Sequence, residues 1–99
     1  MQTAPDKDPA AILDYTRAWA NELDPGESIA SSSWTVSGDD EALILGVDGR
    51  GPTFGATTAT CWLLGGTAGL TYTVTNHIVT DAAPAREFER SFEIFISDL

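Results

Sequence analysis

The sequence predicts an all-β fold, an antiparallel sandwich of about six or seven short strands. Runs rich in threonine, valine, isoleucine and aromatic residues recur along the chain, and their branched or planar side chains suit a pleated, half-buried surface. Turns containing glycine, proline or aspartate separate these runs. The last run alternates most clearly: Phe88, Phe92, Ile94 and Ile96 share one face, and Glu87, Glu89, Ser91 and Glu93 share the other.

Residues 61–76 organise the predicted fold. Two apolar and threonine-rich runs flank the segment Gly65-Gly66-Thr67-Ala68-Gly69, whose glycines supply the backbone angles that a tight reversal needs. The simplest interpretation is two neighbouring antiparallel strands joined by a short loop. Tyr72 follows this segment, at the start of a strand whose residues on the same face are Val74, Asn76 and Ile78.

The position of Tyr72 is typical of the tyrosine corner of immunoglobulin-like sandwiches. In that motif the hydroxyl bonds to a backbone group a few residues upstream and fixes the crossover between strands. The alternative is an ordinary core tyrosine. We therefore predict an immunoglobulin-like (fibronectin III-like) sandwich whose structural residues are Trp34, Tyr72, Gly65, Gly66 and Gly69.

The 99 residues are enough for one domain. Residues 1–9 are polar and contain two prolines, which predicts an extended arm; a frayed end is favoured over an arm ordered against a neighbouring subunit. Residues 10–99 form the predicted immunoglobulin-like domain. After its first segment, strands are expected at residues 28–37, 42–47, 53–64, 70–80 and 86–97, with turns at 24–27, 38–41, 48–52 and 81–85.

The first segment, residues 10–23, is compatible with two structures. Its apolar residues fit a helix capped by Asp8, with Pro9 at the first helical position. They also fit a strand, because four of them share one parity: Leu13, Tyr15, Trp19 and Leu23. Periodicity alone does not decide between the two.

Charge and cysteine content bear on the class of partner and on the cellular compartment. Fifteen acidic and five basic residues give a net charge of −10, which opposes binding to nucleic acid or to an anionic membrane and favours a basic protein partner. Cys61 has no partner for an internal disulfide and is expected to be a small buried residue rather than a nucleophile. The chain shows no leader and no apolar run of membrane-spanning length, so a reducing interior is expected.

No catalytic, cofactor-binding or metal-binding constellation is apparent, and a non-enzyme without a cofactor is predicted. His77 is the only histidine, and its parity is opposite to that of Tyr72, which predicts a surface or interface position without a second ligand or nucleophile nearby. Asp39, Asp40 and Glu41 lack the spaced oxygens and the glycine bend of a calcium loop, so a solvated turn is expected.

Several segments of the chain resemble one known family. They are Ile12-Leu13-Asp14-Tyr15 with Trp19, Gly26-Glu27-Ser28-Ile29 with Ser32 and Trp34-Thr35-Val36, then Trp62-Leu63, Gly65 to Gly69 and Tyr72 to Asn76, and finally Glu89-Arg90-Ser91 with Ile94. In this order they resemble small tailed-phage and prophage proteins described as fibre–tail adaptor or minor virion structural proteins with an immunoglobulin-like fold. The resemblance implies that residues 10–23 form the first strand. Residues 38–57 depart from the family pattern because they are longer and more acidic.

The resemblance implies a non-enzymatic virion structural protein, an adaptor or connector between larger components of the tail–fibre or head–tail region. Its partners would be other virion proteins and copies of itself in a symmetric assembly, and its location would be the virion, assembled in the host cytoplasm. Docking would pair the acidic loops with a basic surface, backed by an apolar patch or an exposed strand edge.

Two other functions compete with the connector role. One is a capsid-surface decoration protein. The other is a carbohydrate- or receptor-binding module that stacks its ligand on Trp19, Trp34 or Trp62, which is disfavoured because a small sandwich needs its aromatic residues in the core.

Overall fold

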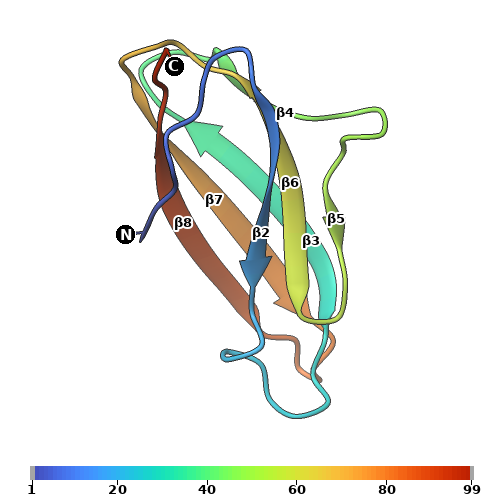
Figure 1. The fold of residues 1–99 in the computed structure, drawn as a ribbon. Coiled ribbons are helices and arrows are strands. Elements are labelled where there is room, and N and C mark those ends of the chain that lie inside the picture. Colours follow the sequence, from blue (N-terminus) through green and yellow to red (C-terminus); the bar gives the residue numbers. More distant parts are fainter. Residues whose placement is uncertain (1, 99) are drawn as a thin grey trace.

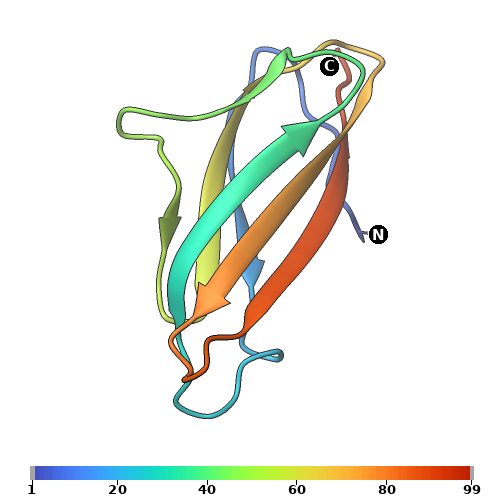
Figure 2. The same cartoon turned by 180° about the vertical axis from the view of Figure 1, so that it is seen from behind.

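The computed structural model describes residues 2–98, and all regular elements in this part of the chain are strands. They form two sheets, one ordered β1-β8-β7-β3 and the other ordered β2-β6-β4, with β5 also paired to β6 (Figures 1 and 2). The strands are β1 (Gln2–Thr3), β2 (Ile12–Ala18), β3 (Ile29–Ser37), β4 (Leu43–Leu45), β5 (Thr53–Phe54), β6 (Thr58–Gly65), β7 (Thr71–Thr80) and β8 (Glu87–Phe95). The all-β prediction is confirmed, and the two layers are compatible with the predicted sandwich.

Residues 12–18 form a strand, so the helical alternative for this segment is wrong. β2 pairs antiparallel with β6 along its whole length, from Ile12 opposite Leu64 to Ala18 opposite Thr58. β2 ends at Ala18, whereas the shared parity of its apolar residues predicted a strand that continued to Leu23. A turn follows it, in which the Glu22 amide donates to the Trp19 carbonyl at 2.9 Å.

The predicted strand over residues 53–64 is wrong, because the chain reverses inside it. β5 and β6 are antiparallel partners, joined by a turn in which the Gly55 amide donates to the Thr58 carbonyl at 2.9 Å. The carbonyls of this turn bind the two neighbouring strand ends. Ala56 accepts from the Ile29 amide at 2.9 Å, and Thr57 accepts from the Trp19 amide at 2.8 Å. These long-range bonds satisfy the carbonyl groups of the reversal, which have no partner in the β5–β6 ladder.

The strands on either side of the Gly-Gly-Thr-Ala-Gly segment lie in different sheets, so the expectation of two paired neighbours is also wrong. β6 lies between β2 and β4, whereas β7 lies between β3 and β8. Both strands are central, and each turns its buried side chains toward the other layer. Gly65, Gly66 and Gly69 have φ values of 76°, 101° and 90°, a region that favours glycine, and they carry the chain from one layer to the other.

Residues from both sheets share the core. The larger cluster of buried residues comprises Trp34, Leu43, Ala59, Cys61, Leu63, Tyr72, Val74, Ile94 and Ile96. A smaller cluster at the other end contains Trp19, Ile29 and Ile78. There the Trp19 indole donates to Asn76 Oδ1 at 2.8 Å, and the Asn76 amide group donates to Ser32 Oγ and to the Ser33 carbonyl, each at 3.0 Å.

The last strand has the predicted faces. Arg90 shares the apolar parity, which predicts that it marks a strand end where its guanidinium reaches solvent or a carboxylate, and the predicted position is wrong. Ile94 and Ile96 are buried on the inner face, and Phe88 and Phe92 are half-buried there. Arg90 lies in the middle of β8 rather than at a strand end. Its guanidinium lies 5.8 Å from the Trp19 ring centre and 3.8 Å from the Glu22 carboxylate. The cation therefore covers the aromatic ring and still reaches a carboxylate.

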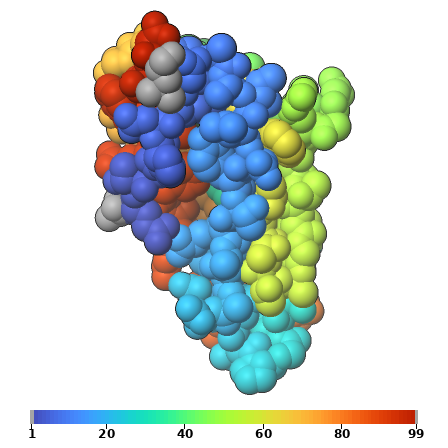
Figure 3. Space-filling model, in the orientation of Figure 1, coloured from blue at the N-terminus to red at the C-terminus, as the bar shows by residue number. Residues whose placement is uncertain are grey.

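The described part of the N-terminal arm is extended, but it is not frayed. β1 pairs parallel with β8, and further along the arm the Lys7 amide donates to the Phe95 carbonyl at 3.0 Å. The Lys7 side chain is fully buried, and its Nζ donates to the carbonyl of Gly65 at 2.8 Å and to that of Asp8 at 2.9 Å. Burial lowers the pKa of Lys7. Figure 3 shows the arm lying against the C-terminal part of the chain and beside β2.

Candidate interaction surfaces

Tyr72 lies at the entrance to β7 and is fully buried. Its hydroxyl accepts a hydrogen bond from the Thr67 backbone amide, five residues upstream, at 3.0 Å. The hydroxyl also donates to Asp40 Oδ1 at 2.5 Å. The tyrosine thus connects the crossover segment of one end of the sandwich to the turn that follows β3.

Asp40 is the residue of this end that sequence reasoning missed. Within the turn that was expected to be solvated, it accepts from the Thr67 hydroxyl at 2.7 Å, from Tyr72 and from the Ala42 amide at 3.0 Å. The hydrogen bond from Thr67, followed by those from Tyr72 and Ala42, lowers the pKa of Asp40 below its ordinary value. No local sequence signal separates Asp40 from its acidic neighbours, since its partners Thr67 and Tyr72 lie far along the chain.

The other predicted structural residues contact this end of the sandwich or the core. The Gly66 amide donates to the Ala42 carbonyl at 3.0 Å, and the Gly69 amide donates to the Ile96 carbonyl at 2.7 Å. A methyl group added to Gly65 would lie 2.6 Å from the Ala42 carbonyl oxygen. Trp34 is buried in the larger core cluster, and its indole N–H has no acceptor among the described residues.

Replacing Tyr72 with phenylalanine is expected to lower the free energy of unfolding by about 1–3 kcal/mol, because the Thr67 amide and Asp40 lose a partner while the ring remains in place. Chemical denaturation of both proteins measures the effect. Tyr15→Phe is the matched control, since no hydrogen bond involves its hydroxyl among the described residues. An unchanged denaturation midpoint in Tyr72→Phe would contradict a structural role for the hydroxyl.

The lowered pKa of Asp40 predicts a loss of stability in acid. A carboxylate whose pKa is lower in the folded state contributes stability above its unfolded pKa, near 3.8, and this contribution disappears as the pH falls through the folded pKa. Asp40→Asn should therefore lose stability at neutral pH and converge on the wild type in strong acid. Denaturation midpoints measured between neutral and acidic pH test this; parallel curves for the two proteins would show that Asp40 does not titrate with folding.

The two candidate reactive side chains, His77 and Cys61, are respectively bound to carboxylates and buried. His77 lies on the outer face of β7, where Nε2 contacts Glu87 at 2.8 Å and Nδ1 contacts Glu89 at 3.1 Å. The bonds to Glu89 and Glu87 raise the pKa of His77. Cys61 is a free, buried thiol whose pKa burial raises to about 12. Within residues 2–98, no three potential metal ligands cluster, and no helix is long and apolar enough to span a membrane.

The outer face of the β2-β6-β4 sheet carries exposed apolar side chains. Ile12, Leu64 and Ile44 are opposite one another on three neighbouring strands. Ile12 is 41% exposed and Ile44 is 52% exposed. Trp62 is half-buried on the same face, two residues from Leu64, with the Arg50 guanidinium 5.8 Å from its ring centre. We call this surface the apolar face.

The outer face of the opposite sheet is mainly polar, with the exposed Phe95 at one end of β8. Three rows cross β3, β7 and β8, and we call this surface the hydroxyl face: Ser33, His77 and Glu89; Thr35, Thr75 and Ser91; and Ser37, Thr73 and Glu93. Within it, the hydroxyls of Thr75 and Ser91 are 2.7 Å apart. The two broad surfaces of the molecule therefore differ in chemistry.

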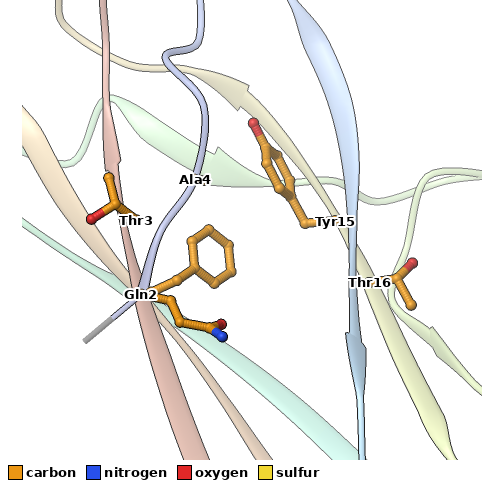
Figure 4. Close-up of a pocket in the computed structure, with 6 residues that line it drawn as sticks. Gln2, Thr3, Ala4, Tyr15 and Thr16 are labelled. Carbon is orange, nitrogen blue, oxygen red and sulfur yellow. The ribbon is translucent and has the colours of Figure 1, made fainter.

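The sandwich is open along both of its sides. On one side, a hollow of about 350 Å³ lies between β2 and the arm, and Figure 4 shows Tyr15 pointing from β2 toward the arm residues Thr3 and Ala4. The arm partly fills this side. On the other side, a hollow of about 490 Å³ lies between the end of β3 and β4.

The comparisons with known proteins identify a family. A family model described as podophage GP4 fiber-tail adaptor protein gp77 matches residues 7–95. No curated protein and no solved structure matched the chain. The matched region extends from the buried Lys7 to the end of β8 and so includes both broad faces, but it leaves out the arm residues that line the hollow beside β2. The chain therefore belongs to the podophage fiber-tail adaptor family of gp77.

Proposed function

We propose that this protein is a non-enzymatic connector that bridges two larger components of a phage virion in the tail–fibre or head–tail region. The observation that carries the proposal is the contrast between its two broad surfaces. The apolar face presents Ile12 and Ile44 to solvent, whereas the hydroxyl face presents serine, threonine and carboxylate groups. An adaptor must contact two different components, and two chemically distinct faces on opposite sheets suit two different partners.

An immunoglobulin-like arrangement of the strands is part of the proposal. In such sandwiches, strands B and E lie in one sheet, and strands C, F and G lie in the other. β2 paired with β6, opposite β3, β7 and β8, follows this order. Tyr72 at the start of β7, with its hydroxyl bonded to an upstream amide, supports the same assignment because the tyrosine corner lies at the start of strand F.

The net charge favours virion partners with basic surfaces. At −10, copies of the chain repel one another in low salt, so we propose that contacts between copies form only within an assembly held by the larger components. Such a chain is unsuited to nucleic acid and to anionic membranes. Assembly in the host cytoplasm agrees with a single, reduced cysteine.

A non-enzymatic role agrees with the state of the reactive groups. The Cys61 thiol is buried and resists deprotonation, and both nitrogens of His77 contact carboxylates. A glycan-binding role has less support than the connector role. Trp19 and Trp34 are buried, and Trp62 alone of the three tryptophans is partly accessible. A glycan array probed with the free protein tests this alternative, and strong specific binding would favour it.

The expected result for purified particles is that this chain is present and leaves as salt rises above about 0.15 M, where screening acts within roughly 8 Å. Mass spectrometry of the particles detects the chain, and assays of the wash fractions measure its release. Absence of the chain from intact particles would contradict the connector role. Retention through molar salt would instead reject docking by charge and favour burial of the apolar face.

A further inference from the structure

The free edge of β3 differs from the other long sheet edges of the molecule. β3 pairs with β7 on one side only, and Figure 2 shows it as the outermost strand of the nearer sheet. At its start the Ile29 amide donates to the Ala56 carbonyl, so the free edge begins after Ile29. Unpaired strand edges invite pairing with other chains, and proteins usually protect them with charged residues, prolines or covering segments. The arm covers part of β8, and β2 carries Asp14 and Arg17. β3 has nine residues and contains neither a charge nor a proline.

A hollow with apolar and acidic walls lies beside this unprotected edge. We call it the β3 groove, and its lining includes Val36, Leu43, Ile44, Leu45, Asp40 and Glu41. β4, on its far side, also pairs with β6 alone. The groove thus combines unpaired backbone on β3, room for apolar side chains and carboxylates at one end. The acidic turn Asp39-Asp40-Glu41 follows β3 directly, and all three residues are exposed.

We propose that an extended segment of a partner virion protein adds to the free edge of β3 as a further strand, with apolar side chains in the β3 groove and a lysine or arginine beside the acidic turn. This inference rests on the connector role and specifies its docking mode. Strand addition satisfies the unpaired backbone groups of the edge, and the side chains that enter the groove select the partner. In variable-type immunoglobulin sandwiches, additional strands extend the sheet of strands C, F and G.

Charge complementarity decides between a partner segment and a second copy of this chain. A second copy brings ten excess negative charges, and its exposed acidic turn Asp39-Asp40-Glu41 directly follows its own β3, whereas Asp24 and Glu27 before β3 are paired with Arg86. Parallel pairing of two β3 edges would place the two acidic turns side by side, and pairing in either direction brings together two chains of like net charge. A segment with an uncharged, β-branched centre and a basic end avoids this repulsion and gains an opposite charge at the turn.

The test uses the isolated chain and a synthetic peptide of alternating threonine and valine with two lysines at one end. The peptide is titrated into the isolated chain, and binding is followed by the NMR chemical shifts of the chain's backbone amides. The expected result is concentration-dependent shifts at Ser31 to Ser37 and Leu43 to Leu45. The same peptide with its consecutive central amides N-methylated should lose at least about tenfold in affinity, because it cannot donate to a strand edge. Shifts confined to β2 or the arm, or none up to about 1 mM peptide, would overturn the proposal.

Two matched variants test whether the acidic turn attracts the lysines of the peptide and whether the peptide binds at the β3 edge rather than at the β2 edge. Glu41→Lys should weaken binding of the lysine-ended peptide by roughly three- to tenfold, because it exchanges attraction for repulsion at an exposed site. Asp14→Lys makes the same charge change on the opposite edge strand and should leave binding unaltered. Equal effects of the two variants, or equal binding of the N-methylated peptide, would refute edge addition at β3. These outcomes do not depend on whether particles contain the chain, so they are distinguishable from failure of the connector role.

Discussion

Replacing Trp19 with alanine is expected to lower the free energy of unfolding by about 3–5 kcal/mol, the largest effect of any single tryptophan substitution in this chain. Trp19 is 0% exposed, and its ring fills the smaller core cluster with Ile29 and Ile78. The truncation leaves a cavity there and also removes the indole donor from Asn76 Oδ1. A buried acceptor without a partner adds to the cost of the cavity. Chemical denaturation at neutral pH measures the change.

Two further substitutions separate packing from hydrogen bonding. Trp19→Phe keeps an aromatic ring but leaves Asn76 without its indole donor, whereas Trp34→Phe removes an N–H that has no acceptor within residues 2–98. The first variant should therefore be less stable than the second. Trp62→Ala, on the partly exposed apolar face, should lose only about 1–2 kcal/mol because less apolar area is removed from contact. A loss for Trp19→Ala no greater than that for Trp62→Ala would contradict the role of Trp19.

The second large effect is expected at Gly66, where alanine should cost about 3 kcal/mol. Gly66 has φ of 101°, and an added Cβ would lie 2.7 Å from a side-chain carbon of Ile96. Gly69 provides the matched control. Its φ is 90°, but an added Cβ would have no atom within 4 Å, so Gly69→Ala should cost only the backbone strain, about 1 kcal/mol.

The difference between the two glycine variants measures the contact with Ile96 rather than the backbone angle. In a double-mutant cycle, Gly66→Ala should lower the free energy of unfolding less in an Ile96→Ala background than in the wild type, because the contacting side chain is then absent. Equal losses for Gly66→Ala and Gly69→Ala would show that the crossover segment shifts freely. In that case Ile96 would not constrain the approach of the segment to β8.

Local patterns of the sequence determined most of the strands and the faces that they bury. Alternation predicted that Ile94 in β8 and Ile96 just after it are buried, and the opposite parity predicted His77 on the outer face of β7, because successive side chains of a strand point to opposite faces. The same pattern predicted that Cys61 is buried. Residues 12–18 needed more than periodicity, since their apolar spacing also fits a helix. The resemblance to a family decided that segment, and the pairing of β2 with β6 confirms the strand.

The tertiary structure alone decided which strands pair and which polar residues are functional parts of the fold. A lysine between two aspartates gives no sign of burial, yet Lys7 is enclosed because the Gly65 carbonyl, fifty-eight residues away, accepts from its Nζ. Asp40 differs from its acidic neighbours through its hydrogen bonds with Thr67 and Tyr72, which lie far along the chain. The placement of β6 and β7 in opposite sheets also depends on partners distant in sequence, and the carbonyls of the reversal after Gly55 bind the distant amides of Ile29 and Trp19. Local periodicity reports which face of a strand is apolar, whereas pairing and burial of polar groups depend on contacts that form only when the two layers close.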